Sequence, residues 1–147
     1  MVSLSEGGYP PALDRLGYYF RHGIGTDKDL VAARLWYMLA VAAGHPWSTA
    51  SLARVEIKLE HGAAALRSLQ TGVIKNQPGT LRLLATAHID RQLGGASNPE
   101  FGRDLLEWMI NHGDKTAARD LAVRVNWGRL MPPTSDRAHA QIVHEGP

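Results

Sequence analysis

Glycines recur along this chain at a nearly constant interval, and the interval limits the folds open to it. Gly8, Gly44, Gly79 and Gly113 enclose segments of 36, 35 and 34 residues, and a stretch with helical spacing of apolar residues follows each glycine. A period near 35 residues is the length of one helix-turn-helix unit, and such units stack because none can bury its apolar face alone. The spacing therefore predicts an all-α solenoid of about three helix-turn-helix repeats plus a terminal helix.

Capping signals and apolar spacing place the individual helices. Pro10 and Pro11 suit a first helical turn, and Asp27 is the expected N-cap of the second helix. That second helix is apolar nearly all round, as expected for a helix packed on two sides. Gly72 lies inside a helix and is expected to weaken the second unit. The expected helices are 10–22, 27–43, 48–60, 63–75, 80–93, 99–112 and 114–125.

The composition agrees with a hydrophobic core that needs no disulfide or metal ion to stabilise it. The chain has 147 residues, of which 44% are apolar, and it has no cysteine, which excludes disulfides, thiolate nucleophiles and cysteine zinc sites. A net charge of +2 is small for a protein that binds nucleic acid through phosphate contacts. The longest apolar stretch, residues 30–43, contains Arg34 and is shorter than the roughly 20 residues of a membrane helix. We therefore expect neither a nucleic-acid partner nor a membrane span.

The two ends of the chain carry different signals. The first seven residues lack the basic and apolar regions of a signal peptide, so the expected location is cytoplasmic as the chain stands, or periplasmic if the N-terminus results from processing or truncation. Beyond Trp127 the sequence contains Pro132 and Pro133 and a mostly polar run. This predicts a solenoid over residues 1–127 and a mobile or folded-back tail over 128–147.

A dozen residues of the first unit match a known repeat in order and spacing. They are Ala12, Leu16, Gly17, Phe20, Gly23, Gly25, Asp29, Ala33, Trp36, Tyr37, Ala40 and Gly44. Over residues 8–53 the chain resembles the Sel-1-like repeats, relatives of the tetratricopeptide repeats, and over 54–127 the pattern is degenerate, with Leu105 and Leu106 in place of the Trp-Tyr pair. The resemblance implies a right-handed superhelix that acts as an adaptor or scaffold, often in bacteria, and it implies no catalysis.

Packing accounts for the large and small residues of this motif. Small residues permit close helix approach, large ones fill the space between helix pairs, and glycines allow the chain to reverse. We therefore assign a structural role to Leu16, Gly17, Phe20, Gly23, Gly25, Trp36, Tyr37 and Gly44.

Histidines and carboxylates raise the question of a reactive site. No two of the seven histidines lie four residues apart, the spacing of a helical metal site, so we expect no metal, no cofactor and no catalytic residue. Glu56 with Glu60, and Asp104 with Glu107, have basic neighbours and are expected on solvated faces. The histidines are His22, His45, His61, His88, His112, His139 and His144.

The resemblance also indicates a binding surface. The family's groove positions lie on the first helix of each unit, on the side away from Leu16, Gly17 and Phe20. Basic residues with aromatic neighbours fill them here, as at many binding hot spots, which predicts a groove for an acidic peptide or the acidic surface of another protein. The alternative is a set of ordinary solubilising side chains. The groove residues are Asp14, Tyr18, Arg21, His22, Arg54, Lys58, Arg82, Arg119 and Trp127.

These features predict a non-enzymatic protein-protein interaction module, in the first place a bacterial adaptor or scaffold. One alternative is an immunity protein that neutralises a cognate toxic effector, since the resemblance covers such proteins and three repeats suffice for an interface of standard size. An enzyme or enzyme regulator is an alternative of another class, and it would need a polar pocket with perturbed titrating groups. The identity of the partner and the oligomeric state do not follow from the sequence.

Overall fold

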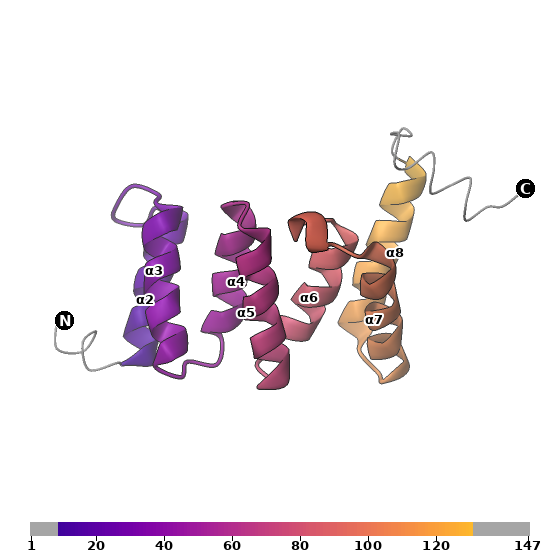
Figure 1. Cartoon of the computed structure of the whole chain (residues 1–147), viewed down its shortest axis with the longest axis horizontal. Helices are drawn as coiled ribbons and strands as arrows, with labels where there is room; N and C mark the ends of the chain where they lie inside the picture. The colour runs from indigo at the N-terminus through magenta and orange to yellow at the C-terminus, as the bar shows by residue number, and fades with distance from the viewer. Residues whose placement is uncertain (1–8, 131–147) are drawn as a thin grey trace, which may run out of the picture.

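The protein is all-helical over the residues that the structure describes. This computed structural model describes residues 9–130, with side chains up to Arg124, and within that range it contains seven α-helices, one 3₁₀ turn and no strand. Figure 1 shows the helices side by side in a row, with α2 and α8 at opposite ends. The elements are α2 (Pro10–His22), α3 (Leu30–Ala42), α4 (Ser48–Lys58), α5 (Gly62–Ile74), α6 (Thr80–Ile89), η1 (Gly94–Ala96), α7 (Pro99–Asn111) and α8 (Lys115–Leu130).

Each helix packs mainly against the helix before it and the helix after it, and α4 also touches α6. The core is consequently a series of local clusters along the row. Tyr37 and Leu52 belong to the cluster of α2, α3 and α4, Leu69 to that of α4, α5 and α6, and Leu106 to that of α6, α7 and α8.

The first helix pair begins and ends at specific capping residues. Helix α2 begins at Pro10, as predicted, and ends at Gly23, whose φ of 67° is in the left-handed region. The prediction that Asp27 caps the next helix is wrong, because Asp29 does so, with Oδ1 accepting a hydrogen bond from the backbone N–H of Ala32 at 3.0 Å. The N–H of Asp29 itself donates to the carbonyl of Phe20, which holds the turn open until residue 29.

Two later boundaries also differ from the prediction. Helix α6 ends at Ile89 rather than at 93, because Arg91 adopts a φ of 56° and the N–H of Gln92 turns back to the carbonyl of Ala87. Helix α8 continues to Leu130, so the predicted division at residue 127 falls inside a helix. Pro132, the first proline after the start of α8, comes only after that point in the sequence. The predicted tail, from 131 onward, lies outside the described residues.

One face of α3 is exposed, whereas the sequence predicted that both sides would be packed. The buried side carries Ala33, Tyr37 and Ala40, which meet α2 and α4. The opposite side has no helix against it within the described range. Its large apolar side chains, 41 to 63% exposed, are Val31, Leu35, Met38 and Leu39.

Gly72 is a point of close contact and not the predicted weak point of the second unit. A Cβ atom added at Gly72 would lie 2.4 Å from Cγ2 of Thr80, so α5 and α6 approach each other where only glycine fits. Gly17 on α2 has the same relation to the ring of Tyr37, at 2.8 Å. The helix penalty of an interior glycine is thus offset by tighter packing.

Candidate functional site

Three arginines on the first helices of successive pairs lie close enough for the charges of Arg21 and Arg82 to act on Arg54. The hydroxyl of Ser48 at the start of α4 donates to Oδ1 of Asp14 on α2 at 2.6 Å, which aligns the two helices. Arg21 and Arg54 lie about two turns further along α2 and α4, respectively, from that bond. Gly79, just before α6, lies beside Ala50 on α4. Arg54 follows Ala50 by about one turn, and Arg82 follows Gly79 by about one turn. We call Arg21, Arg54 and Arg82 the arginine row.

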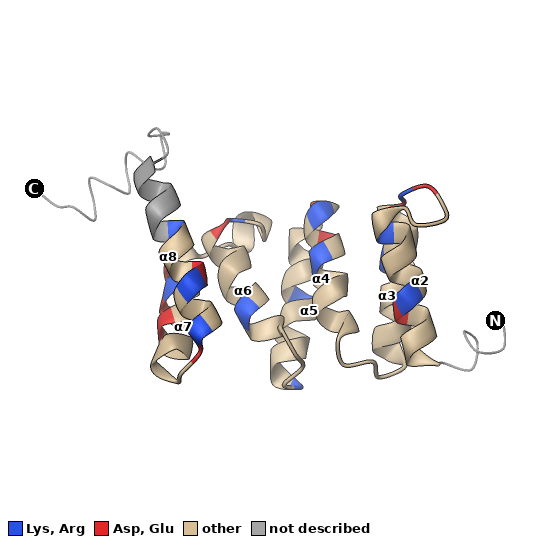
Figure 2. Ribbon diagram, turned by 180° about the vertical axis from the view of Figure 1, so that it is seen from behind, with Lys and Arg blue, Asp and Glu red and all other residues tan. Residues whose placement is uncertain are grey.

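The electrostatics of the row are unfavourable for the central arginine. Burial lowers the pKa of Arg54, and the charges of Arg21 and Arg82 lower it further. Among the described residues, no carboxylate lies within ion-pair distance of Arg21 or Arg54. In Figure 2, ribbon segments with lysine or arginine, in blue, recur along the line of helices from α2 to α8. A half-buried guanidinium between two like charges is an arrangement that an incoming anion would relieve.

Tyr37 lies beneath the first part of the row. Its side chain is buried, and burial is the main cause that raises the pKa of its hydroxyl, to which the charge of Asp14 adds. The charge of Arg21 and a hydrogen bond with it lower the pKa of Tyr37, and a hydrogen bond with Ser51 also lowers it. The hydroxyl of Tyr37 and the guanidinium of Arg21 therefore lie close enough to influence each other.

Two other predicted binding residues lie together at the outer side of α2. The rings of Tyr18 and His22 are 4.2 Å apart between centroids, and both residues are exposed. Asp14 lies nearby but is engaged, since it accepts the Ser48 hydrogen bond and lies 3.8 Å from Nδ1 of His45. An open pocket of about 380 Å³ is lined by Pro11, Asp14, Arg15, Tyr18, Tyr19 and His45.

The remaining predicted groove residues are Lys58, Arg119 and Trp127. Lys58 is exposed at the end of α4, where it lines an open pocket of about 420 Å³ together with Arg91. Arg119 is exposed on α8. Trp127 belongs to α8, but its side chain lies outside the described residues.

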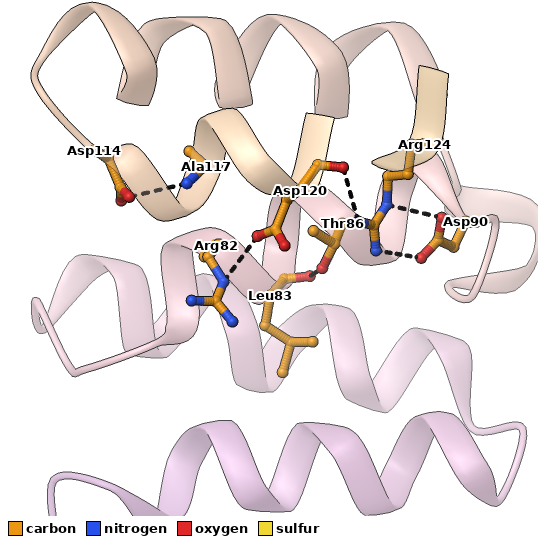
Figure 3. Close-up of polar contacts among 8 residues, drawn as sticks. All are labelled: Arg82, Leu83, Thr86, Asp90, Asp114, Ala117, Asp120 and Arg124. Atoms are coloured by element: carbon orange, nitrogen blue, oxygen red, sulfur yellow. Dashed lines mark hydrogen bonds and ion pairs between the residues drawn. The ribbon is translucent and has the colours of Figure 1, made fainter. Parts of the chain in front are cut away.

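The acidic end of the row was missed by sequence reasoning. Asp120 on α8 places Oδ2 3.0 Å from Nε of Arg82, and Figure 3 shows this ion pair beside a second one between Arg124 and Asp90. One sequence signal was present, because Asp120 and Arg124 are four residues apart and share a helix face. Their partners on α6 could not be foreseen, since a whole helix, α7, intervenes in the chain.

The prediction of a solvated Glu56 is wrong, because this carboxylate is buried and bound. It pairs with Arg34 at 3.1 Å and accepts a hydrogen bond from Ser68 at 2.7 Å, so it belongs to the packing of α3, α4 and α5. Asp104 and Glu107 are exposed, as expected. Within residues 9–130 no three histidine, aspartate or glutamate side chains gather as metal ligands would.

No described helix combines the length and the apolar content that crossing a bilayer requires. No protein-family model, no curated protein and no solved structure matches the chain. The arginine row and the arrangement of the helices are therefore the features that indicate a function.

Proposed function

We propose that this chain is a Sel-1-like helical-repeat protein that binds an acidic segment of another protein through the arginine row. In this proposal the helices form a right-handed α-solenoid, and the first helices α2, α4, α6 and α8 line its concave face. The function is that of an adaptor or scaffold, without chemistry at the site.

Packing between sequence neighbours supports the repeat architecture. Each helix contacts the next one, as in proteins whose repeats touch only adjacent repeats. Glycines in the left-handed region recur at the period seen in the sequence, at Gly44, Gly79 and Gly113. The same backbone reversal thus follows each helix pair, which favours stacking of equivalent units.

The environment of Arg54 is the observation that carries the binding proposal. This side chain is half-buried between Arg21 and Arg82, and its own fold offers it no acid within the described residues. Folding therefore maintains an electrostatic cost that an anion from outside would remove. Arginine is permanently charged and only donates hydrogen bonds, so the row can bind carboxylates but cannot act as a general base.

The expected ligand is extended, with acidic side chains at every third position. Packed helices lie about 8–10 Å apart, and a peptide in the extended polyproline II conformation advances about 3.1 Å per residue with three residues per turn, so that every third side chain lies on the same side. Carboxylates three residues apart therefore reach arginines on neighbouring first helices. A suitable probe is a fluorescein-labelled peptide with three glutamates separated by glycine-serine pairs.

Binding of this probe, measured by fluorescence anisotropy at low salt, tests the proposal. We expect Arg54→Gln to weaken binding at least about tenfold, since a charge-assisted hydrogen bond contributes about 1.5–3 kcal/mol. The matched control is Arg67→Gln, which removes the same charge from an exposed position on α5. Equal losses in the two variants would reduce the effect to net charge and contradict the proposal.

A second comparison tests the spacing of the ligand. A peptide of the same composition with its three glutamates adjacent has the same charge but cannot reach along the row. We expect it to bind more weakly than the spaced peptide, and a peptide with glutamine at all three positions not to bind. Equal affinity of the two charged peptides would contradict an extended ligand along the row.

A further inference from the structure

We propose that Asp120 is an internal occupant of the arginine row, which holds Arg82 in the free protein and gives way when a partner's carboxylate binds. This inference rests on the proposed function, because it concerns the regulation of the same surface. Along the row, α8 is the next first helix after α6, so Asp120 stands where a fourth position would follow Arg82.

The contact between Asp120 and Arg82 is incompletely satisfied. Oδ2 of Asp120 is buried and lies 3.0 Å from Nε of Arg82, yet no hydrogen bond to this oxygen is formed. A buried carboxylate oxygen without a hydrogen bond is costly, so the pair contributes less than its distance suggests. The side chain of Arg82 is 43% exposed, which leaves its guanidinium open to an acid from solution.

The neighbouring ion pair would keep α8 in place when Asp120 releases Arg82. Arg124 makes two hydrogen bonds to the carboxylate of Asp90, at 3.0 and 2.7 Å, and a third to the backbone carbonyl of Asp120 at 3.1 Å (Figure 3). Ala117 and Leu121 pack in the core cluster of α6 and α7. Release of Arg82 therefore requires only a side-chain rotation of Asp120, and no movement of the helix.

This arrangement makes Asp120 a competitor for the ligand. A partner's acid gains the pairing with Arg82 only after the pairing with Asp120 is lost, so the free protein binds acidic segments more weakly than the row alone would. The competition also screens partners, because weakly acidic segments do not displace Asp120.

Removal of the competitor's charge tests the inference, with the spaced glutamate peptide as the probe. We expect Asp120→Asn to bind the probe about two- to fivefold more tightly, the range for a partly exposed ion pair of 0.5–1 kcal/mol. Asp104→Asn is the matched control, since it removes the same charge from an exposed position on α7. Arg82→Gln added to Asp120→Asn should abolish the gain.

The outcomes separate this inference from the proposed function. If the unaltered protein binds the probe through Arg54 but Asp120→Asn gives no gain, or a gain no larger than Asp104→Asn, the inference is overturned and the binding site stands. If no variant binds the probe, both are overturned.

A measurement on the unaltered protein does not depend on how the Asp120 variant folds. In a titration with the probe followed by NMR, we expect the Nε–H resonances of both Arg82 and Arg54 to shift in parallel. A shift at Arg54 with none at Arg82 would show that Asp120 keeps its arginine in the complex, and would overturn the inference.

Discussion

Arg34 on α3 and Glu56 on α4 form an ion pair in which Nε and Nη2 of the arginine both lie 3.1 Å from the same carboxylate oxygen, Oε2. The other oxygen, Oε1, accepts a hydrogen bond from Ser68 on α5. The glutamate side chain is only 3% exposed, whereas that of Arg34 is 31% exposed. One buried carboxylate thus joins three consecutive helices. Within the ion pair the two members differ, because the glutamate is buried and the arginine is partly exposed.

The asymmetry of this pair predicts unequal costs of substitution. Arg34→Met leaves a buried carboxylate with a single hydrogen bond, and we expect the free energy of unfolding to fall by about 3–5 kcal/mol. Glu56→Gln keeps a hydrogen-bond acceptor and leaves a cation that water reaches, so we expect a smaller loss. Urea unfolding of both variants measures the difference, and a larger loss for Glu56→Gln would contradict the role assigned to burial.

Gly72→Ala should destabilise the protein even though alanine is the better helix former. The new Cβ would lie 2.4 Å from Cγ2 of Thr80 and 3.0 Å from Cγ2 of Thr49, and we expect overpacking to cost about 1–3 kcal/mol. Thermal unfolding gives the measurement, with Gly95→Ala as the control, because nothing lies within 4 Å there.

A second substitution identifies the clash in the Gly72 variant. Thr80→Ser removes Cγ2 and keeps the hydroxyl that donates to the carbonyl of Gln77. Added to Gly72→Ala, it should restore part of the lost stability. No recovery in the double variant would mean that the contacts with Cβ of Thr80 and Cγ2 of Thr49, and not this methyl group, limit the approach of the helices.

His88 should make stability depend on pH. Its ring is buried, Nδ1 accepts a hydrogen bond from the N–H of Asn98, and burial lowers the pKa of the imidazole below its ordinary value near 6.5. The unfolded state then binds the proton first as the pH falls, so this contribution is fully present above about pH 6.5 and is lost towards the lower pKa of the folded state. Chemical unfolding between pH 7.5 and 5 measures the slope.

Two variants isolate the part of that slope due to His88. His88→Asn offers an oxygen in place of Nδ1 and does not titrate, so the fall in stability below pH 6.5 should become shallower. His61→Asn replaces an exposed histidine and should leave the slope unchanged. Equal slopes in the unaltered protein and in His88→Asn would contradict this assignment.

Arg54→Met should stabilise the free protein while it weakens binding of the acidic probe. The substitution removes a half-buried charge from between two like charges and keeps a long apolar stem, and we expect a gain of at most about 1 kcal/mol. Added salt screens the repulsion, so it should stabilise the unaltered protein more than the variant. A clear loss of stability in Arg54→Met would show that the row is a packing feature and not a strained binding site.

Local signals in the sequence placed most of the helices. The prolines at the starts of α2 and α7 and the glycines after α2 and α3 act on the backbone of their own turn, so the boundaries they mark need no tertiary information. The prediction of Asp27 as the cap is wrong because Asp29, two residues later, is also an aspartate and caps a helix equally well. Only the hydrogen bond from Asp29 to Phe20, across the turn, distinguishes the two.

The candidate site, like the helix boundaries, has features that the sequence indicates and features that depend on tertiary contacts. The sequence suggested Arg21, Arg54 and Arg82 as groove residues on successive first helices, but the repeat period does not align them, because they are 33 and 28 residues apart and the period is near 35. Only the tertiary structure brings their charges close enough to act on one another. The sequence did not reveal that Arg82 already has a partner in Asp120, or that Glu56 is buried, because each depends on which side chain a neighbouring helix presents.

The sequence by itself determined the helical class and the order of the helices, since periodicity and capping act over one or two turns. Only the tertiary structure decided which charges are paired, which glycine is a contact point and which apolar face stays open. Those outcomes depend on distances of a few ångströms between helices, and the spacing of residues along a chain does not contain such distances.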